Sequence, residues 1–468
     1  SLPQRRWKFF FKWIISSSTT HIASHIRCRL YKVVKIDLLT TAIDIRATDS
    51  PDRSELFCKG VSKSQSLRKA LKFTTKLNFG IVNEFVLSRA LKSLNIVQHL
   101  NYFPEDKTVL TQGFRFIRIL PTFKYLKHIN KNLKSFILNE DFRMSQDLAQ
   151  RLLYKLRTNR KLITLKLPEI IDDHINRLSS LCFSFPQLQH LRVMGNNFES
   201  LLRSFKSAKQ LLTMEIRPSQ FYPLKTCKLE FISLVNKNKN SLNSLKLGLN
   251  EQISAEVLKE TFSGVKALRH LHVQLIRVSP DIYPALEELD LETLHLVHTN
   301  QTAVSQAQIK ILTNIIPKFK KLTRFSFLFV ESSLEGGSVA LIGAALSKVK
   351  SLKSLHIRLY RNNRPFFEKY TPQQGLKHFK LELQFPRKEE LDALPRFLRA
   401  FNKTNLTDFR LDLAYSSSWS RVYSCSTRNS ENDFSCQLII GPWPVQTNQF
   451  PALLFDAEEY AKLGRTPT

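Results

Sequence analysis

Histidine is the residue type in this chain whose clustering could indicate metal or acid–base chemistry. Several histidines lie in short apolar segments, at His190, His270, His272, His356 and His378. No carboxylate stands at a metal-ligand spacing from them, so they are better explained as exposed side chains on strands than as a metal site. The chain also contains no GxxxxGK(S/T) phosphate loop, no GxSxG nucleophile turn and no HExxH zinc pair. We therefore expect no enzyme activity, no metal or cofactor, and no small-molecule substrate.

Lysine and arginine dominate the charge of the chain. They number 71 against 39 aspartates and glutamates, which gives a formal net charge of +32 and a pI near 10.0. A field of this sign favours nucleic acid, anionic lipid or acidic protein as partners, although solubility alone would also account for it. The longest apolar runs fall short of the roughly 18 residues that a membrane span needs, so no transmembrane span is expected.

A short apolar phrase recurs along the chain. It places leucine-like residues at positions i, i+3 and i+5, as in Leu188, Leu191 and Val193. The phrases lie mostly about 23 to 31 residues apart and begin at Leu133, Leu162, Leu188, Leu211, Leu242, Leu268, Leu286, Leu322, Leu352, Leu376 and Leu406. The i+3 and i+5 residues share one face of a strand, and helix-like segments lie between the phrases. Because one strand–helix unit cannot bury its own apolar face, the units are expected to stack into a solenoid.

This repetition resembles the leucine-rich repeat superfamily, in its helix-containing, ribonuclease-inhibitor-like branch, over roughly residues 120 to 415. The resemblance implies an α/β fold with a curved parallel sheet inside and helices outside. Leu191, Leu245, Leu271 and Leu355 occupy i+3 positions. They are therefore predicted to be buried in the core.

The chain is expected to contain four segments. Residues 1–36 are a basic N-terminal arm or a targeting remnant, and residues 37–120 are an N-terminal cap or degenerate repeats. Residues 121–415 form the leucine-rich-repeat array, and residues 416–468 form an irregular C-terminal extension. An organelle transit segment, a retained arm and an untidy terminus of a basic protein all fit the N-terminal stretch. The basic residues of this stretch that are candidates for binding are Arg5, Arg6, Lys8, Lys12, Arg27 and Arg29.

Cysteine usage bears on the compartment. The 6 cysteines include no CxxC pair, a pattern that fits a reducing, intracellular compartment with buried free thiols. Cys182 and Cys227 are therefore predicted to be buried, and Cys425 and Cys436 to remain unbridged. Together with the basic N-terminal stretch, this interpretation favours the mitochondrion over the cytoplasm or nucleus.

Two surfaces are candidates for binding. The resemblance implies that outward strand positions line a concave binding face, whose predicted residues are Lys166, Arg192, Lys246, His272, Asp290, His356, Lys380 and Arg410. Acidic residues interrupt this column, so it suits a protein ligand better than a uniform polyanion. Lysines also gather just before the phrases, where stacking would align them along one rim at intervals of about 4.8 Å. The predicted rim residues are Lys161, Lys209, Lys239, Lys266, Lys320, Lys321, Lys348 and Lys350. The preference of cations for helix C-termini, about 0.3–1 kcal/mol each, accounts for some of them.

We therefore expect a non-enzymatic scaffold or binding subunit of a larger assembly, such as a supernumerary subunit of a mitochondrial complex or ribonucleoprotein. Its rim would contact acidic protein, RNA or anionic lipid. The alternative is a free recognition protein that uses the concave face, such as an F-box-like ubiquitin-ligase substrate receptor or a signalling adaptor. The segment LPEIIDDHINRLSSL, from Leu167, is similar to the opening of an F-box, but it lies within the second repeat, where a helix is required anyway.

Overall fold

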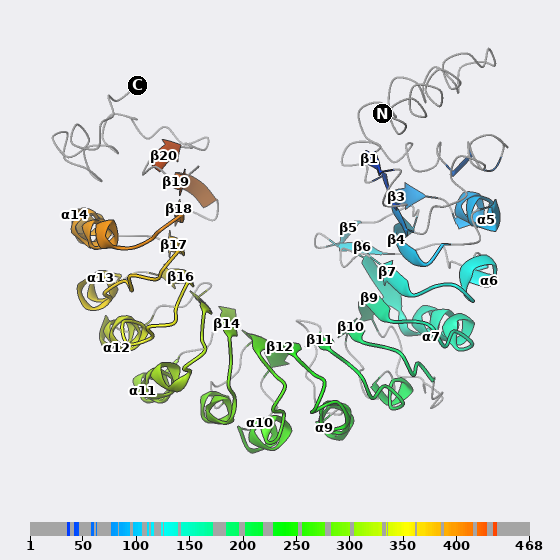
Figure 1. Ribbon diagram of the computed structural model, residues 1–468, viewed down its shortest axis with the longest axis horizontal. Coiled ribbons are helices and arrows are strands. Elements are labelled where there is room, and N and C mark those ends of the chain that lie inside the picture. Colours follow the sequence, from blue (N-terminus) through cyan, green and yellow to red (C-terminus); the bar gives the residue numbers. More distant parts are fainter. Residues whose placement is uncertain are drawn as a thin grey trace, which may run out of the picture. The chain divides into compact units, whose positions relative to one another are not determined.

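The computed structural model divides the chain into two compact units, unit 1 (Ser1–Leu242) and unit 2 (Asn243–Thr468) (Figure 1). The structure describes residues 35–37, 42–45, 58–59, 62, 76–82, 84–93, 97–104, 110–111, 114–116, 123–124, 126–138, 142–171, 184–195, 202–218, 228–250, 255–276, 282–299, 304–329, 334, 336–360, 363–384, 388–414, 419–427 and 434–437.

Unit 2 is built on a ladder of parallel strands that pair in chain order. These strands are β12 (Ser244–Asn250), β13 (His270–Ile276), β14 (Thr293–Thr299), β15 (Arg324–Phe329), β16 (Ser354–Tyr360), β17 (His378–Gln384) and β18 (Asp408–Ala414). Their register runs from Leu245 through Leu271 and Leu294 to Phe409 without a shift. The side chains along this line are buried, so the i+3 position of every repeat contributes to one continuous core.

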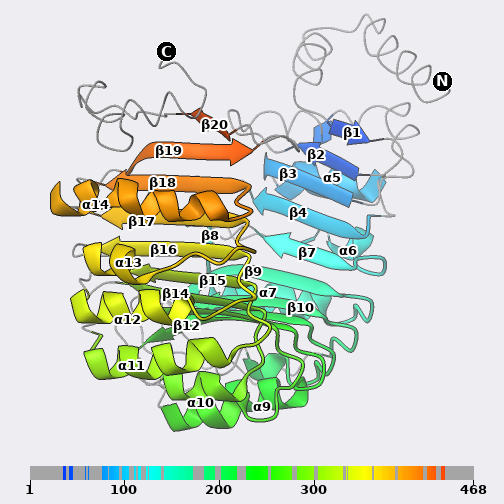
Figure 2. The same ribbon diagram turned by 60° about the vertical axis from the view of Figure 1, so that its left-hand side comes forward.

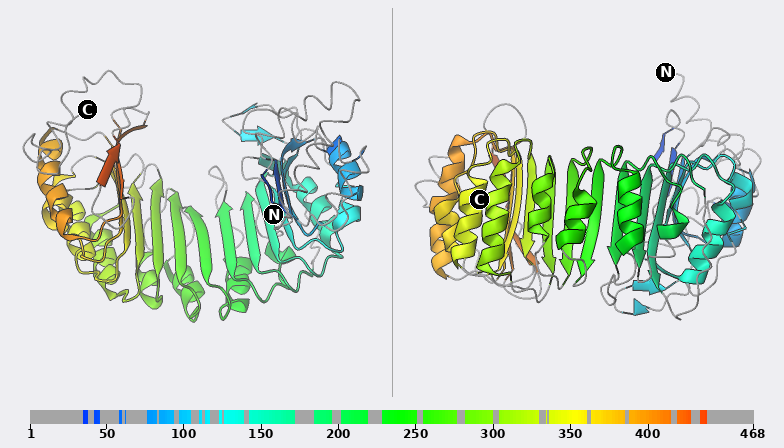
Figure 3. Two further views of the ribbon diagram at one scale, coloured as in Figure 1. Left: turned by 45° about the horizontal axis from the view of Figure 1, so that its top comes forward. Right: turned by 90° about the horizontal axis from the view of Figure 1, so that it is seen from below.

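Helices connect successive strands of unit 2 and cover one side of its sheet (Figures 1 and 3). They are α10 (Ala255–Phe262), η1 (Tyr283–Glu288), α11 (Gln306–Ile315), η2 (Ile316–Lys318), α12 (Gly336–Leu346), α13 (Arg364–Lys369), α14 (Lys388–Arg399) and η3 (Ala400–Lys403). Local sequence determines where they begin. In α11, Ser305 and Gln308 form a reciprocal capping box that satisfies two backbone N–H groups. In α12, Gly343 allows close packing on α13, because a Cβ there would lie 3.1 Å from the backbone nitrogen of Tyr370.

The described part of the C-terminal extension is more regular than the sequence predicts. Strand β19 (Trp419–Thr427) pairs antiparallel with β18, and β20 (Phe434–Gln437) pairs antiparallel with β19. Figure 2 shows β16 to β19 lying side by side. An antiparallel partner covers the edge that the parallel ladder would otherwise leave open. The register sets Cys425 opposite Cys436.

Unit 1 repeats the same plan with more irregularity. Its parallel ladder consists of β2 (Ala42–Ile45), β3 (Lys76–Val82), β4 (His99–Pro104), β7 (Ser135–Leu138), β9 (Thr164–Ile171), β10 (His190–Gly195) and β11 (Thr213–Pro218). The other described elements are β1 (Lys35–Asp37), α5 (Glu84–Ser93), β5 (Leu110–Thr111), β6 (Phe114–Phe116), α6 (Leu126–Ile129), β8 (Phe142–Ser145), α7 (Gln146–Leu156) and α9 (Lys228–Lys237). Parallel pairing thus extends N-terminal to residue 121, into the region predicted as a cap or degenerate repeats.

The irregularity is concentrated around β9. Strand β7 ends early, and β8 pairs with the second half of β9 in its place. Two residues of β9, Leu167 and Pro168, stand opposite the single Val193 of β10, which forms a bulge. Proline cannot donate to the ladder, so a bulge is a position that tolerates it. Beyond the bulge the two strands run so close that a Cβ on Gly195, whose φ is +146°, would lie 2.1 Å from the carbonyl oxygen of Ile170.

The burial prediction for the repeat phrase is confirmed. Leu191 is 2% exposed, and Leu245, Leu271 and Leu355 are each 1% exposed. The strands that carry them pair in parallel, as stacking of the repeats requires.

One of the predicted phrases is misplaced. Leu286 lies on the 3-10 helix η1, which begins with Pro284 in its first turn, and not on a strand. The phrase of this repeat is formed by Leu291, Leu294 and Leu296, which have the same i, i+3, i+5 spacing. Both phrases are buried, so leucine spacing alone does not separate them. With the phrase at Leu291, the long gap before Leu322 disappears and the repeat lengths become regular.

Candidate functional site

The outward side of the unit 2 ladder carries a row of basic and histidine side chains. Because alternate residues of a strand point to opposite faces, the residues next to the buried line form a second line on the other face. The strand registers align Lys246, His272, His295, Ser326, His356, Lys380 and Arg410 in this line, which we call the strand-face row. The row contains no carboxylate.

The strand-face row corrects one predicted site residue. Asp290 was predicted on the concave face, but it precedes β14 and has no place in the ladder. His295 occupies the position instead, paired with His272 on one side and Ser326 on the other. The error follows from the misplaced phrase at Leu286. The similar length of the other repeats was the signal in the sequence that favours the phrase at Leu291 and with it His295.

His295 lies in an electropositive environment. Its pKa is lowered first by burial, and then by repulsion from His356, Arg324, Lys246 and His270. Its ring centroid lies 5.6 Å from that of His272, at an interplanar angle of 32°. At neutral pH, His295 is therefore an uncharged imidazole surrounded by basic groups.

Buried carboxylates balance the cations at the other end of the row. Glu382 on β17 is 2% exposed, receives a 2.8 Å hydrogen bond from His356 and forms ion pairs with Arg358 and Lys380. Burial raises the pKa of Glu382, but these hydrogen bonds and the charge of Arg358 lower it more, so the net pKa is below that of an ordinary glutamate. On β18, the guanidinium of Arg410 binds the buried Asp412 at 2.8 Å. This end of the row is thus an internally paired network.

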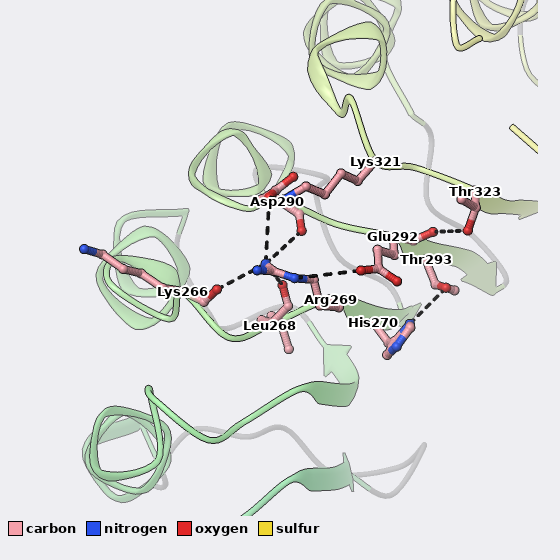
Figure 4. Close-up of polar contacts among 9 residues, drawn as sticks. All are labelled: Lys266, Leu268, Arg269, His270, Asp290, Glu292, Thr293, Lys321 and Thr323. Carbon is pink, nitrogen blue, oxygen red and sulfur yellow. Dashed lines mark hydrogen bonds and ion pairs between the residues drawn. The ribbon is translucent and has the colours of Figure 1, made fainter. Parts of the chain in front are cut away.

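The predicted basic rim of unit 2 is interrupted by the acidic repeat. Arg269 donates to the backbone oxygens of Asp290 at 3.2 Å and of Lys266 at 3.1 Å, and it lies 3.9 Å from carboxylate oxygens of both Asp290 and Glu292 (Figure 4). Lys321 approaches the same Asp290 carboxylate at 2.6 Å. Arg269 was not among the predicted residues, although its position directly after the first leucine of the phrase at Leu268 was an available signal.

The remaining predicted rim lysines of unit 2 are exposed: Lys266, Lys320, Lys348 and Lys350. Within the described part of the chain, Lys321 is the one predicted rim lysine that forms an ion pair. Two lysines that were not predicted belong to the same rim. Lys353 and Lys377 are exposed, and the backbone N–H of Lys377 donates to the carbonyl of Lys353 at 2.8 Å, so they stack on adjacent repeats.

The predicted rim lysines of unit 1, Lys161, Lys209 and Lys239, are also exposed. Two buried asparagines that were not predicted, Asn159 and Asn238, bond to the loops that carry these lysines. Asn159 donates to the carbonyl of Leu133 and accepts from the backbone N–H of Lys161. Asn238 donates to the carbonyl of Ala208 and accepts from the backbone N–H of Leu211, both in the preceding repeat. These amides tie one repeat to the preceding one and fix the loops that carry the lysines.

Arg192 is a second correction. It was predicted as a binding residue of the concave face, yet it is only 8% exposed. Its guanidinium donates to the backbone carbonyls of Leu138 at 2.6 Å and Leu167 at 3.3 Å. These carbonyls lie where β7 ends and where β9 bulges, so Arg192 serves the sheet itself. Lys166, the neighbouring prediction in unit 1, remains partly exposed.

Several predictions fall outside the described residues. They include the basic arm (Arg5, Arg6, Lys8, Lys12, Arg27 and Arg29) and the thiols Cys182 and Cys227. Cys58, which the structure describes, is buried and unbridged. Of the F-box-like segment, Leu167–Ile171 continue strand β9, and residues 172–181 lie outside the described ranges.

The described ranges contain neither a group of metal-ligating side chains nor a helix that could span a membrane. No group of three or more histidine, cysteine, aspartate or glutamate side chains in those ranges is arranged to share a metal ion. None of the helices described is both long enough and apolar enough to cross a bilayer.

The stacked strand–helix repeats, their parallel registers and the buried leucine lines define an α/β leucine-rich-repeat solenoid. No family model matches the sequence, and no curated protein matches it either. Among solved structures, the chain is similar to one chain of the crystal structure of the Rad7 and Elc1 complex in yeast. The two share 13% sequence identity with a TM-score of 0.41, over 79% of this chain and 90% of that chain.

Proposed function

We propose that this chain is a non-enzymatic binding scaffold, of the ribonuclease-inhibitor-like kind, that recognises acidic protein partners within a larger assembly. The observation that carries the proposal is the exposed lysines on the rim of each unit. Among the described residues, the three predicted rim lysines of unit 1 and four of the five of unit 2 stand in no ion pair. Fixed positive charges without internal partners are available to an anionic partner.

The pattern of charge favours acidic protein over RNA or anionic lipid. The rim of unit 2 carries a block of acidic side chains at Glu287, Asp290 and Glu292, which form ion pairs with Lys318, Lys321 and Arg269. The cations of this block are already paired, so a continuous phosphate backbone would gain little attraction where it crossed the block. A protein segment can place its carboxylates at the lysines and leave the acidic block facing neutral residues.

The proposal includes the kind of assembly to which the scaffold belongs. The net charge of +32 suits an assembly with acidic protein or RNA components, such as a mitochondrial complex or ribonucleoprotein. The strand-face row supports a second candidate, a free recognition protein that engages its target through the strands.

The rim is tested with a variant that removes adjacent charges. Lys348→Gln/Lys350→Gln is compared with Lys259→Gln/Lys310→Gln, which removes the same charge from exposed helix positions in unit 2. Binding of the full chain to a fluorescent polyglutamate peptide is measured by anisotropy, with a single-stranded RNA as competitor. We expect the rim variant to bind the peptide about threefold to tenfold more weakly, and the helix variant to match the parent.

Two outcomes would overturn the proposal. If RNA displaces the peptide and binds with a log–log salt slope of about −0.7 per phosphate, the partner is nucleic acid. If the rim variant binds peptide as the parent does, the lysines serve solubility and helix capping.

A further inference from the structure

The centre of the strand-face row combines an uncharged imidazole with fixed cations. His295 on β14 is flanked in the ladder by His272 and Ser326. The ionisable groups that act on it or contact its ring are Lys246 on β12, His270 and His272 on β13, Arg324 on β15 and His356 on β16. All of them are basic, so a proton on His295 is opposed from every neighbouring strand.

The C-terminal end and the centre of the row differ in their supply of carboxylates. At the C-terminal end, Glu382 and Asp412 already supply carboxylates to His356, Lys380 and Arg410. At the centre, the groups acting on His295 supply no negative charge. A carboxylate from a partner could accept hydrogen bonds from His295 and Arg324, as the carboxylate of Glu382 does from His356.

We propose that the strand face around His295 and Arg324 binds a carboxylate-rich protein segment and takes up protons as it binds. This inference rests on the proposed function for the class of partner, but it concerns a surface other than the rim. The row crosses six strand intervals of about 4.8 Å, or about 29 Å. An extended segment of about nine residues would span it.

Proton uptake follows from electrostatics. In the free protein, burial and positive neighbours lower the pKa of His295, so it is neutral near pH 7. A bound carboxylate would raise that pKa, because an opposite charge within hydrogen-bonding distance stabilises the imidazolium. The complex then holds a proton that the free protein does not. Affinity must consequently increase as the pH falls from the pKa in the complex toward the lower pKa in the free protein.

The buried acids at the end of the row favour a protein segment over a nucleic acid. Lys380 and Arg410 are already paired with Glu382 and Asp412, so a phosphate chain that continued along the row would gain little attraction from them. A peptide needs carboxylates only at the central positions and can pass the paired network with neutral side chains.

The test is the pH dependence of peptide binding by the full chain. The probe is a fluorescent peptide of alternating glutamate and glycine, and a glutamine–glycine peptide is the control. We expect the parent to bind the acidic peptide about fivefold to tenfold more tightly at about pH 5.5 than at about pH 7.5, through uptake of about one proton. Calorimetry in two buffers of different ionisation enthalpy measures that uptake directly.

Matched variants assign the effect to the row. His295→Gln should lose most of the pH dependence and most of the proton uptake. Arg324→Gln, at an exposed position, should weaken binding at every pH and leave most of the pH dependence, because burial, the first cause of the low pKa of His295, is unchanged. The circular dichroism spectrum and melting temperature of each variant establish that it is folded; should His295→Gln be unfolded, His295→Asn replaces it.

The inference fails if the affinity of the parent does not change with pH, or if the His295 variant retains the full pH dependence. It also fails if single-stranded RNA binds with the same pH dependence that His295→Gln removes, because the occupant is then a nucleic acid. The rim variant Lys348→Gln/Lys350→Gln separates this failure from that of the proposed function. If that variant is unchanged while the His295 effect persists, the rim is discarded and the strand face retained.

Discussion

Arginines on the strands differ in burial between the two units. In unit 1, Arg143 donates to Glu169 at 2.7 Å with both side chains 9% exposed, and Arg192 donates to two backbone carbonyls. In unit 2, Arg324 is exposed on the outward face. This difference in burial corresponds to a difference in the regularity of strand pairing. Strand β9 has a bulge and an interrupted neighbour, whereas β12 to β18 pair without a shift.

This contrast shows what an irregular register requires. A bulge leaves backbone carbonyls without ladder partners, and a buried carbonyl without a donor is costly. Arg192 supplies the missing donors and is thereby removed from the surface, and Arg143 is buried with the carboxylate of Glu169 on the same bulged strand. Where the ladder is unbroken, the backbone needs no such donor. Arg324 remains exposed for partners, while Lys380 and Arg410 pair with the buried carboxylates of Glu382 and Asp412.

The largest expected effect is on the buried pair of unit 1. Arg143→Met removes the guanidinium from the buried carboxylate of Glu169, which should lower the free energy of unfolding by about 3–5 kcal/mol. Urea denaturation of the full chain measures the change. The control is Arg151→Met, which breaks the exposed pair with Asp147 and should cost only about 0.3–0.5 kcal/mol. Equal losses in the two variants would show that Arg143 does not differ from a surface cation.

A smaller effect is expected for the carbonyl donor. Arg192→Met leaves the carbonyls of Leu138 and Leu167 without the guanidinium and should cost about 1–3 kcal/mol. Arg324→Met in unit 2 changes an exposed side chain and should lie within about 0.5 kcal/mol of the parent. A loss at Arg324 as large as that at Arg192 would contradict the division between structural and surface cations.

The third prediction concerns acid stability in unit 2. Hydrogen bonds and ion pairs hold the pKa of Glu382 below its ordinary value despite burial. Its stabilisation is therefore fully present above the unfolded-state pKa of about 4.3 and is lost as the pH falls through the lower folded-state value. Glu382→Gln should flatten the decline in unfolding free energy between about pH 5 and about pH 3. The substitution Glu389→Gln, at an exposed position, should leave the decline as in the parent. An equal flattening in that variant would contradict the assignment of the acid sensitivity to Glu382.

Much of the fold could be predicted because the repeat phrase is a local property of the chain. Leu191 and Leu271 alternate with polar residues at a strand period, and that alternation alone determines which side chains can share an apolar face. The exposure of the rim lysines follows similarly, since a lysine in a loop before a strand has no apolar surface to cover it.

Other features depend on neighbours that are distant in sequence. Leu286 and Leu291 both begin acceptable phrases, and pairing with β13 and β15 decides between them, which brings His295 and not Asp290 onto the strand face. Arg192 has the spacing of a surface residue, but the bulge in β9 and the early end of β7 draw it into the sheet. Sequence periodicity thus determined which residues are apolar partners, while strand register, which exists only once repeats stack, decided which polar residues face a ligand and which complete the backbone.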